Sequence, residues 1–233
     1  NDYYDLSLKK LNAEDLIKAG VEVIEVDLRV EESYKPLSTD FDFIIHFAAQ
    51  PGISSSCTFE EYLTNNIIAT EKLIKFAHQN KNLKQFVNIG TSSIYGLEAT
   101  FPESVAPMPA SNYGVTKLAA EQLVLAETRS KRMSACSLRL YSVYGPRERP
   151  EKLYTKLIAC AFNKEAFPLF NGSEKHLRSF TYVGDIVDGI VAVVNRYESV
   201  NGEIINLGTE VEHTTQDGID YVEELLGQKI EMD

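Results

Sequence analysis

The stretch FDFIIHFAA, residues 41–49, is apolar almost throughout. A strand has this composition when helices cover both faces of a parallel sheet, because neither side then meets water. Apolar side chains recur at helical spacing over residues 59–80, and another largely apolar run, KQFVNIGTSS, follows at 84–93. This order of strand, helix and strand predicts a parallel sheet of the α/β class.

The same alternation continues on both sides of this core. GVEVIEVDL (20–28) predicts an earlier strand, a helical pattern covers 113–129, and SACSLRLYSVYG (134–145) predicts a later strand. We therefore expect a Rossmann-like, doubly wound parallel sheet. Ligands in such sheets bind beyond the carboxyl ends of the strands, so the residues that follow each strand are the candidates for function.

Composition limits the classes of partner. The chain has 233 residues and a formal net charge of −11, which disfavours nucleic acid as a general partner. No apolar run approaches the ~20 residues needed to cross a membrane, and no signal-peptide pattern opens the sequence, so we expect a cytoplasmic protein without membrane contact. The three cysteines lack a CxxC pair and the four histidines lack ligand spacing, which predicts no metal site.

Each predicted strand is followed by residues that could contact a ligand. Asp27 at the end of the first could cap a helix or accept hydrogen bonds from a nucleotide. HFAAQPG (46–52) offers small residues that let a backbone lie close to a ligand or pack under a helix. GTSSIYG (90–96) places three hydroxyl groups in a turn, which is also ordinary loop chemistry.

The segment SNYGVTKLAAEQL (111–123) places Tyr113 and Lys117 four residues apart at the start of a helix. Residues at this spacing share one helical face. An ammonium beside a phenol stabilises the phenolate, and the positive end of the helix dipole acts in the same direction. Such a tyrosine can serve as a general base near neutral pH, whereas a lone pair of this kind is usually an exposed surface pair.

Seven short motifs occur in an order that resembles a known family, and they are spread over nearly the whole chain. They are VDL, HFAAQPG, NNIIAT, GTSSIYG, YGVTK, LRLYSVYGPR and RSFTYVGDIVDGI. Together they resemble the extended short-chain dehydrogenases/reductases, specifically the NAD-dependent nucleotide-sugar epimerase/dehydratase family. The resemblance implies NAD as cofactor and a UDP-sugar as substrate. It also implies a homodimer in which the helices at 59–80 and 113–129 of two copies form a four-helix bundle.

The resemblance also implies a role for particular residues. Thr91, Tyr113 and Lys117 would form the catalytic set. The cofactor-binding residues would be Asp27, Leu28, Phe47, Ala48, Ala49, Gln50, Asn66, Tyr113 and Lys117. The substrate-binding residues would be Ser92, Ser142, Arg147 and Arg178. Arg147 alternates with acidic residues in GPRERP, so a solvated loop is the competing interpretation for it.

Two parts of the family pattern are absent. The glycine-rich turn on the first strand and helix, which holds the pyrophosphate, does not occur, and the C-terminal substrate segment is short. We therefore expect an interior piece of a longer protein. Residues 1–145 would be the remainder of the NAD-binding domain, and residues 146–233 an incomplete substrate-binding domain whose segment 178–208 returns to the sheet. The choice between NAD and NADP stays open at this point, because the usual discriminating residue follows the missing second strand.

The turn after Thr91 bears on the reaction. Ser92 and Ser93 stand where dehydratases of the family carry acidic residues, and a hydroxyl cannot do carboxylate chemistry. The sequence therefore favours epimerisation at C4 through a 4-keto intermediate. The alternatives are an NAD(P)-dependent keto-sugar reductase or dehydratase of the same family, and a non-catalytic nucleotide-binding fragment.

Overall fold

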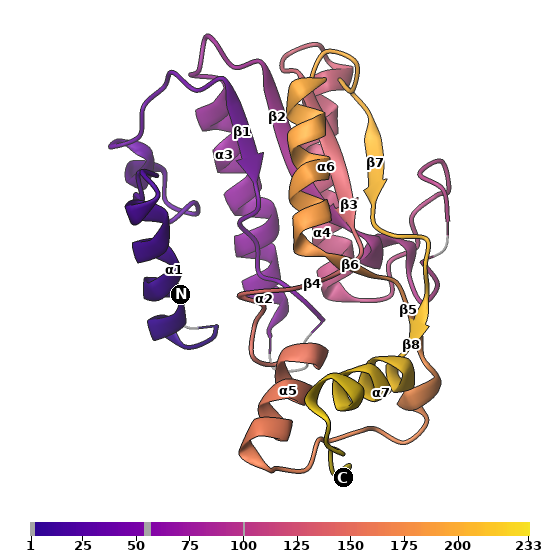
Figure 1. Ribbon diagram of the computed structural model, residues 1–233. Helices are drawn as coiled ribbons and strands as arrows, with labels where there is room; N and C mark the ends of the chain where they lie inside the picture. The colour runs from indigo at the N-terminus through magenta and orange to yellow at the C-terminus, as the bar shows by residue number, and fades with distance from the viewer. Residues whose placement is uncertain (1–2, 54–56, 100) are drawn as a thin grey trace. The chain divides into compact units, whose positions relative to one another are not determined.

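The computed structural model describes residues 3–53, 57–99 and 101–233. By its internal contacts the chain divides into two compact units. One comprises Ile24–Tyr141 and Val187–Leu207, and the other Asn1–Val23, Ser142–Ile186 and Gly208–Asp233. Figure 1 labels the α-helices and strands, and the chain also contains the short helices η1 to η4. In chain order they are α1 (Leu6–Lys18), η1 (Glu31–Tyr34), β1 (Phe43–His46), α2 (Phe59–Tyr62), η2 (Leu63–Ile68), α3 (Ala69–Ala77), β2 (Gln85–Thr91), η3 (Ser92–Tyr95), α4 (Asn112–Arg129), β3 (Ala135–Leu140), β4 (Ser142–Tyr144), α5 (Leu153–Asn163), η4 (Ser173–Lys175), β5 (Leu177–Arg178), β6 (Phe180–Tyr182), α6 (Val183–Asn195), β7 (Ile204–Leu207), β8 (His213–Thr214) and α7 (Thr215–Leu226).

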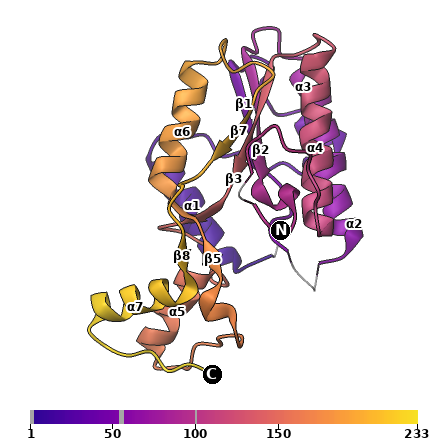
Figure 2. The same ribbon diagram turned by 90° about the vertical axis from the view of Figure 1, so that its right-hand side faces the viewer.

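The first unit is built on a parallel sheet with the strand order β1-β2-β3-β7. The α3 and α4 helices lie side by side on one face of the sheet, and the part of α6 in this unit lies on the other (Figure 2). All seven residues of β2 are buried, as expected for a central strand covered on both faces. The predicted α/β class with a doubly wound parallel sheet is confirmed.

The strand predicted over residues 20–28 is wrong. Residues 21–27 have no regular secondary structure, and Val21, Val23 and Ile24 are exposed. A strand is held by hydrogen bonds to a neighbouring strand, and among the described residues β1, at the edge of the sheet, pairs with β2 alone. The apolar pattern of the segment is therefore present without the partner that would make it a strand.

The helix predicted over 59–80 is found from Phe59 to Ala77, in three consecutive parts. A capping box starts it: the Thr58 hydroxyl accepts from the Glu61 N–H, and the Glu61 carboxylate accepts from the Thr58 N–H. The middle part, Leu63–Ile68, is π-helical. Such segments occur mostly as single turns within α-helices and often at functional sites.

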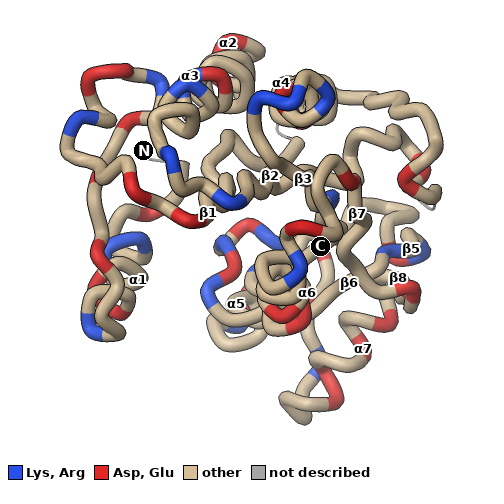
Figure 3. The backbone as a smooth tube through the Cα atoms, turned by 90° about the horizontal axis from the view of Figure 1, so that it is seen from above, with Lys and Arg blue, Asp and Glu red and all other residues tan. Residues whose placement is uncertain are grey.

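The other unit holds two small strand pairs and its own core. β4 pairs with β6 in parallel, β5 pairs with β8 antiparallel, and α5 packs on α7 through Leu157 and Ile219. This unit includes the described residues up to Val23, which the sequence led us to expect in the NAD-binding domain. The α1 helix buries no residue, and basic and acidic residues are interspersed along it (Figure 3). No helix within the described ranges combines the length and apolar character that crossing a bilayer requires.

Candidate active site

Two loops meet the carboxyl edge of the parallel sheet. Residues 47–50 follow β1, and η3 follows β2, whose last residue is Thr91. Because β1 and β2 are parallel, these loops lie at the same edge. Phe47 is 57% exposed and Ala48 is exposed as well, so these residues after β1 are accessible from solvent.

Tyr113 lies in the first turn of α4, and this turn packs closely on the hydroxyl turn. The Ser111 hydroxyl caps the helix by accepting from the Gly114 N–H at 3.1 Å. A Cβ added at Gly114 would come 2.7 Å from the Ser93 carbonyl oxygen, closer than real Cβ atoms approach. The Thr91 hydroxyl donates to the Ser93 hydroxyl at 3.2 Å and accepts from the Ser93 N–H. Glycine after the tyrosine thus permits the helix to approach the residues that follow Thr91.

Lys117 lies one turn further along α4 and is only 4% exposed. Its Nζ donates to the Ile89 carbonyl of β2 at 2.6 Å, and among the described residues this is the one acceptor of its three N–H groups. Burial lowers the pKa of Lys117 to about 8, against the attraction of the Glu121 carboxylate. The ammonium is therefore buried one helical turn after Tyr113 on α4, and it has N–H donors still available to a ligand.

His46, at the end of β1, is the titratable neighbour of Lys117 on the sheet. Burial, followed by repulsion from Lys117, lowers its pKa to about 3, so the imidazole is neutral near pH 7. Its Nε2 lies 2.8 Å from the Thr70 hydroxyl, which itself donates to the Asn66 carbonyl. The hydroxyl therefore accepts from Nε2–H. Within the described ranges no group of three or more His, Cys, Asp or Glu residues could hold a metal ion.

Asn66 lies in the π-helical segment and connects three parts of the site. Its Oδ1 accepts from the Gln50 N–H at 2.7 Å, and its Nδ2 donates to the Thr116 hydroxyl at 3.0 Å. Asn66 and Gln50 are both buried. The asparagine therefore fixes the loop after β1 against the first turns of α4, next to Lys117.

Asp27 and Leu28 have partners of their own. The Asp27 carboxylate is exposed and pairs with Arg29, with Nη2–Oδ2 at 2.7 Å and Nε–Oδ1 at 2.9 Å. The hydrogen bonds from the Arg29 side chain and backbone lower the pKa of Asp27 to about 2. Leu28 packs on the hydrophobic core, and its carbonyl accepts from the Tyr34 hydroxyl at 2.9 Å.

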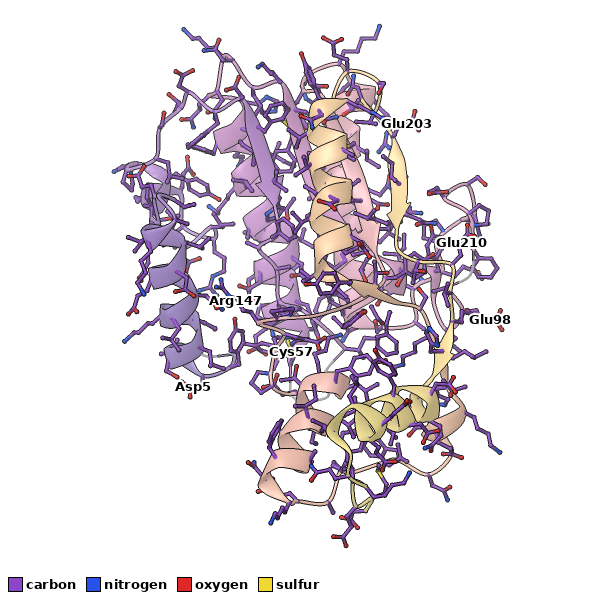
Figure 4. The ribbon with its side chains drawn as sticks, in the orientation of Figure 1. Asp5, Cys57, Glu98, Arg147, Glu203 and Glu210 are labelled. Atoms are coloured by element: carbon purple, nitrogen blue, oxygen red, sulfur yellow. The ribbon has the colours of Figure 1, made fainter. Side chains whose placement is uncertain are left out.

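The remaining predicted substrate residues, apart from Ser92 in η3, belong to the other unit. Ser142 opens β4 opposite Phe180. Arg147, labelled in Figure 4, has a positive φ of 69° and donates to the Asp15 carboxylate of α1 at 2.7 Å. Arg178 is exposed in β5. The structure thus brings Thr91, Ser92, Tyr113 and Lys117 together within the unit that holds the parallel sheet. Ser142, Arg147 and Arg178 belong to the other unit.

The buried pair Glu121–Arg139, whose side chains are each 1% exposed, was not predicted from the sequence. Two signals could have found it. Arg139 interrupts the apolar strand SLRL, and a buried arginine needs a partner. Glu121 follows Lys117 by four residues, as Lys117 follows Tyr113, so all three share a face of α4.

Comparison with known proteins identifies the family. The sequence profile of the NAD dependent epimerase/dehydratase family matches residues 6–208. The chain belongs to the NAD-dependent epimerase/dehydratase family. The match covers the sheet, the hydroxyl turn and the helix that carries Tyr113 and Lys117, and the family depends on NAD.

Individual relatives agree with this assignment. The chain is 34% identical over 191 residues to the uncharacterized UDP-glucose epimerase YtcB of Bacillus subtilis (strain 168), covering 81% of this chain and 60% of the relative. It is 29% identical over 248 residues to UDP-glucuronate 4-epimerase 2 of Arabidopsis thaliana, covering 98% and 57%. The chain thus spans about 60% of the length of these two relatives.

A solved structure extends the comparison to three dimensions. The UDP-glucuronic acid 4-epimerase from Bacillus cereus, crystallised with UDP-glucuronic acid and NAD, superposes with a TM-score of 0.85 at 31% identity. The match covers 98% of this chain and 73% of that one. The expected family resemblance is confirmed, and this chain shares the fold of that solved epimerase.

Proposed function

We propose that the intact protein epimerises a UDP-sugar at C4, with NAD as cofactor, through a 4-keto intermediate. The observation that carries the proposal is the arrangement of α4 on β2. Tyr113 lies in a helical turn packed on the hydroxyl turn, and Lys117 is buried one turn below it. The Bacillus cereus relative, which binds UDP-glucuronic acid and NAD in its crystal, supports the substrate class and the cofactor.

The described residues fit a bound dinucleotide. The exposed residues Phe47 and Ala48 lie at the edge of the sheet, and the ammonium of Lys117 has N–H groups free to donate to ribose hydroxyls. Asn66 fixes Gln50 beside them. When bound, NAD supplies a reversible hydride acceptor.

In this proposal, residues of the chain transfer the proton and bind the sugar. Tyr113, as phenolate, takes the proton of the sugar 4-hydroxyl, with Thr91 as relay. Lys117, as ammonium, stabilises the phenolate through its positive charge. Ser92, Ser142, Arg147 and Arg178 bind the sugar diphosphate, and the planar 4-keto sugar turns over about it. Protonation of the re-formed alkoxide by Tyr113 then completes the cycle.

The chemistry of the hydroxyl turn supports epimerisation over dehydration. Elimination of water from C5 and C6 needs an acid and a base in addition to the tyrosine. Ser92 and Ser93 hold the two positions after Thr91 and supply no carboxylate. Epimerisation at C4 changes only one carbon and requires no such additional acid and base.

The test uses the full-length protein with UDP-glucose, UDP-galactose, UDP-glucuronic acid and UDP-galacturonic acid, with the products separated by chromatography. We expect interconversion of one pair without a net change in nicotinamide absorbance. A steady change in that absorbance would indicate a reductase, and a product lighter by one water a dehydratase. Bound nucleotide without any turnover would support the other alternative, a non-catalytic nucleotide-binding fragment.

The homodimer also stays a proposal. Phe59 of α2, Ile68 of η2 and Val115 of α4 are exposed apolar residues on the helices that the resemblance places in a four-helix bundle. Light scattering after size-exclusion chromatography tests this, since a Val115→Glu variant should shift a dimer toward monomer. A full-length protein that runs as a monomer at all concentrations would contradict the proposal.

A further inference from the structure

Buried polar side chains form a connected network on the side of α4 that faces the sheet. Glu121 and Arg139 make a bidentate ion pair, with Nη2–Oε1 at 2.7 Å and Nε–Oε2 at 3.0 Å. Ser137 donates to the same carboxylate at 3.1 Å, and Arg139 also donates to the Tyr95 hydroxyl at 2.7 Å. Three hydrogen bonds therefore fix the Glu121 carboxylate in place.

This carboxylate lies next to Lys117. The two residues are four apart on α4, which places their Cβ atoms roughly 5–6 Å apart. They also meet adjacent residues of β2: a Cβ added at Gly90 would lie 3.4 Å from Glu121 Oε2, and the Ile89 carbonyl accepts from Lys117 Nζ at 2.6 Å. The carboxylate and the ammonium thus share one buried region between α4 and the sheet.

We propose that Glu121 is a positioning residue of the candidate active site, whose fixed carboxylate keeps Lys117 in its ammonium form below Tyr113. The inference rests on the proposed function, which requires a charged Lys117. Burial works against that charge, and Glu121 is the group whose attraction raises the pKa of Lys117. A neutral residue at position 121 would leave burial unopposed.

The other titratable groups around Lys117 do not replace Glu121. His46, from β1, is neutral near pH 7 because burial and the charge of Lys117 lower its pKa to about 3. Arg139, from β3, is the counter-ion of Glu121, and the attraction that raises the pKa of Lys117 comes from the Glu121 carboxylate. Tyr113, on α4 itself, is the base that the ammonium is proposed to serve. The Glu121 carboxylate is therefore the negative charge that favours the ammonium.

The pKa of Lys117 can be measured by NMR titration of the full-length protein labelled with ¹³Cε-lysine. The signal is identified by its absence from Lys117→Met. Glu121→Gln removes the attraction and leaves Arg139 uncompensated, so the pKa of Lys117 should fall by about one, a tenfold change in the acid dissociation constant. Arg139→Gln leaves the carboxylate without its counter-ion, so the pKa of Lys117 should rise.

Glu127→Gln is the matched control. It removes a carboxylate on the same helix that is paired with Arg132 at 2.7 Å. Glu127 follows Lys117 by ten residues, which is about 15 Å along a helix, so the titration of Lys117 should not change. Circular dichroism establishes that each variant folds. If a single buried variant does not fold, the double variant Glu121→Gln/Arg139→Met, which removes both charges of the ion pair, replaces it and should again lower the pKa of Lys117.

An unchanged pKa of Lys117 in the folded protein lacking the Glu121 charge would overturn the inference. Shifts in the same direction in Glu121→Gln and Arg139→Gln would also overturn it, because they would indicate lost packing. The titration needs neither cofactor nor substrate. If Lys117 responds as expected but no UDP-sugar is interconverted, the proposed function fails while the control of Lys117 by Glu121 stands. If both hold, the alkaline limb of the pH–activity profile should move to lower pH in Glu121→Gln by the same amount.

Discussion

Replacing Gly114 by alanine should displace the proposed base without unfolding the protein. The added Cβ would lie 2.7 Å from the Ser93 carbonyl oxygen and 3.0 Å from Pro109 Cβ. Ordinary contact begins near 3.4 Å, so the first turn of α4 must move by roughly 0.5 Å or more. Tyr113, the preceding residue, moves with this turn relative to Thr91. Misplacement of reacting groups by about 1 Å can cost on the order of 10²-fold in rate.

The stability of the same variant sets the limit of the experiment. Overpacking costs about 1–3 kcal/mol, whereas alanine is a better helix former than glycine by roughly 1 kcal/mol. The net loss is at most about 2 kcal/mol, which lowers the Tm of a chain of this size by less than about 8 °C. The protein should therefore stay folded at 25 °C.

The assay compares kcat for UDP-sugar epimerisation in Gly114→Ala and Asn112→Ala. Asn112 is exposed in the same turn, on the other side of Tyr113 in the sequence, and its variant should behave as the wild type. We expect kcat to fall by about 10–100-fold in Gly114→Ala. A kcat equal to that of the control, in a protein with the expected small loss of Tm, would refute the argument that this contact positions Tyr113.

Three further predictions concern the base, the core and a buried histidine. Tyr113→Phe should lower kcat by about 10²–10⁴-fold with nucleotide-sugar binding retained in calorimetry, and an unchanged kcat would exclude Tyr113 as the base. Leu138→Ala, at a fully buried position of β3, should lower the free energy of unfolding in urea by about 2–5 kcal/mol, whereas Leu97→Ala, at an exposed position, should change it by less than about 0.5 kcal/mol. His46, with a pKa lowered to about 3, stays neutral in the folded state while the unfolded chain takes up a proton below pH ~6.5, so stability should fall by up to about 1.4 kcal/mol per pH unit between ~6.5 and 3. Urea titrations at several pH values check this, and in His46→Asn the stability should depend less steeply on pH than in the wild type. Equal dependence in the two proteins would contradict the assignment of this effect to His46.

Local pattern was sufficient for the elements near the site. The helix that carries Tyr113 and Lys117 was predicted at 113–129 and is found at Asn112–Arg129, because an N-cap serine and helical spacing are written in neighbouring residues. The strands predicted within 41–49 and 84–93 were found as β1 and β2, because their apolar composition is also a property of neighbouring residues. Both lie in the centre of an apolar run bounded by polar turns.

Local sequence pattern does not show which distant segments of the chain pair with one another. Residues 20–28 have the composition of a strand, but no described strand pairs with them. The site residues taken from the family resemblance remain predictions about ligand contacts. The structure adds their neighbours: Asn66 bonded to Gln50, Asp27 paired with Arg29, and Arg147 bonded to Asp15.

The sequence by itself determined the α/β class, the family and the face of α4 on which Tyr113, Lys117 and Glu121 lie, because each of these depends on residue type and on spacing of a few positions. Tertiary structure alone decided that Lys117 is buried against Ile89, and that Glu121 is fixed by Arg139 from β3. The pKa of an ammonium depends on its exposure to solvent and on the charges around it in space. Those charges come from strands and helices far apart in the chain, so the chemistry of this lysine is set only when the sheet and α4 have packed together.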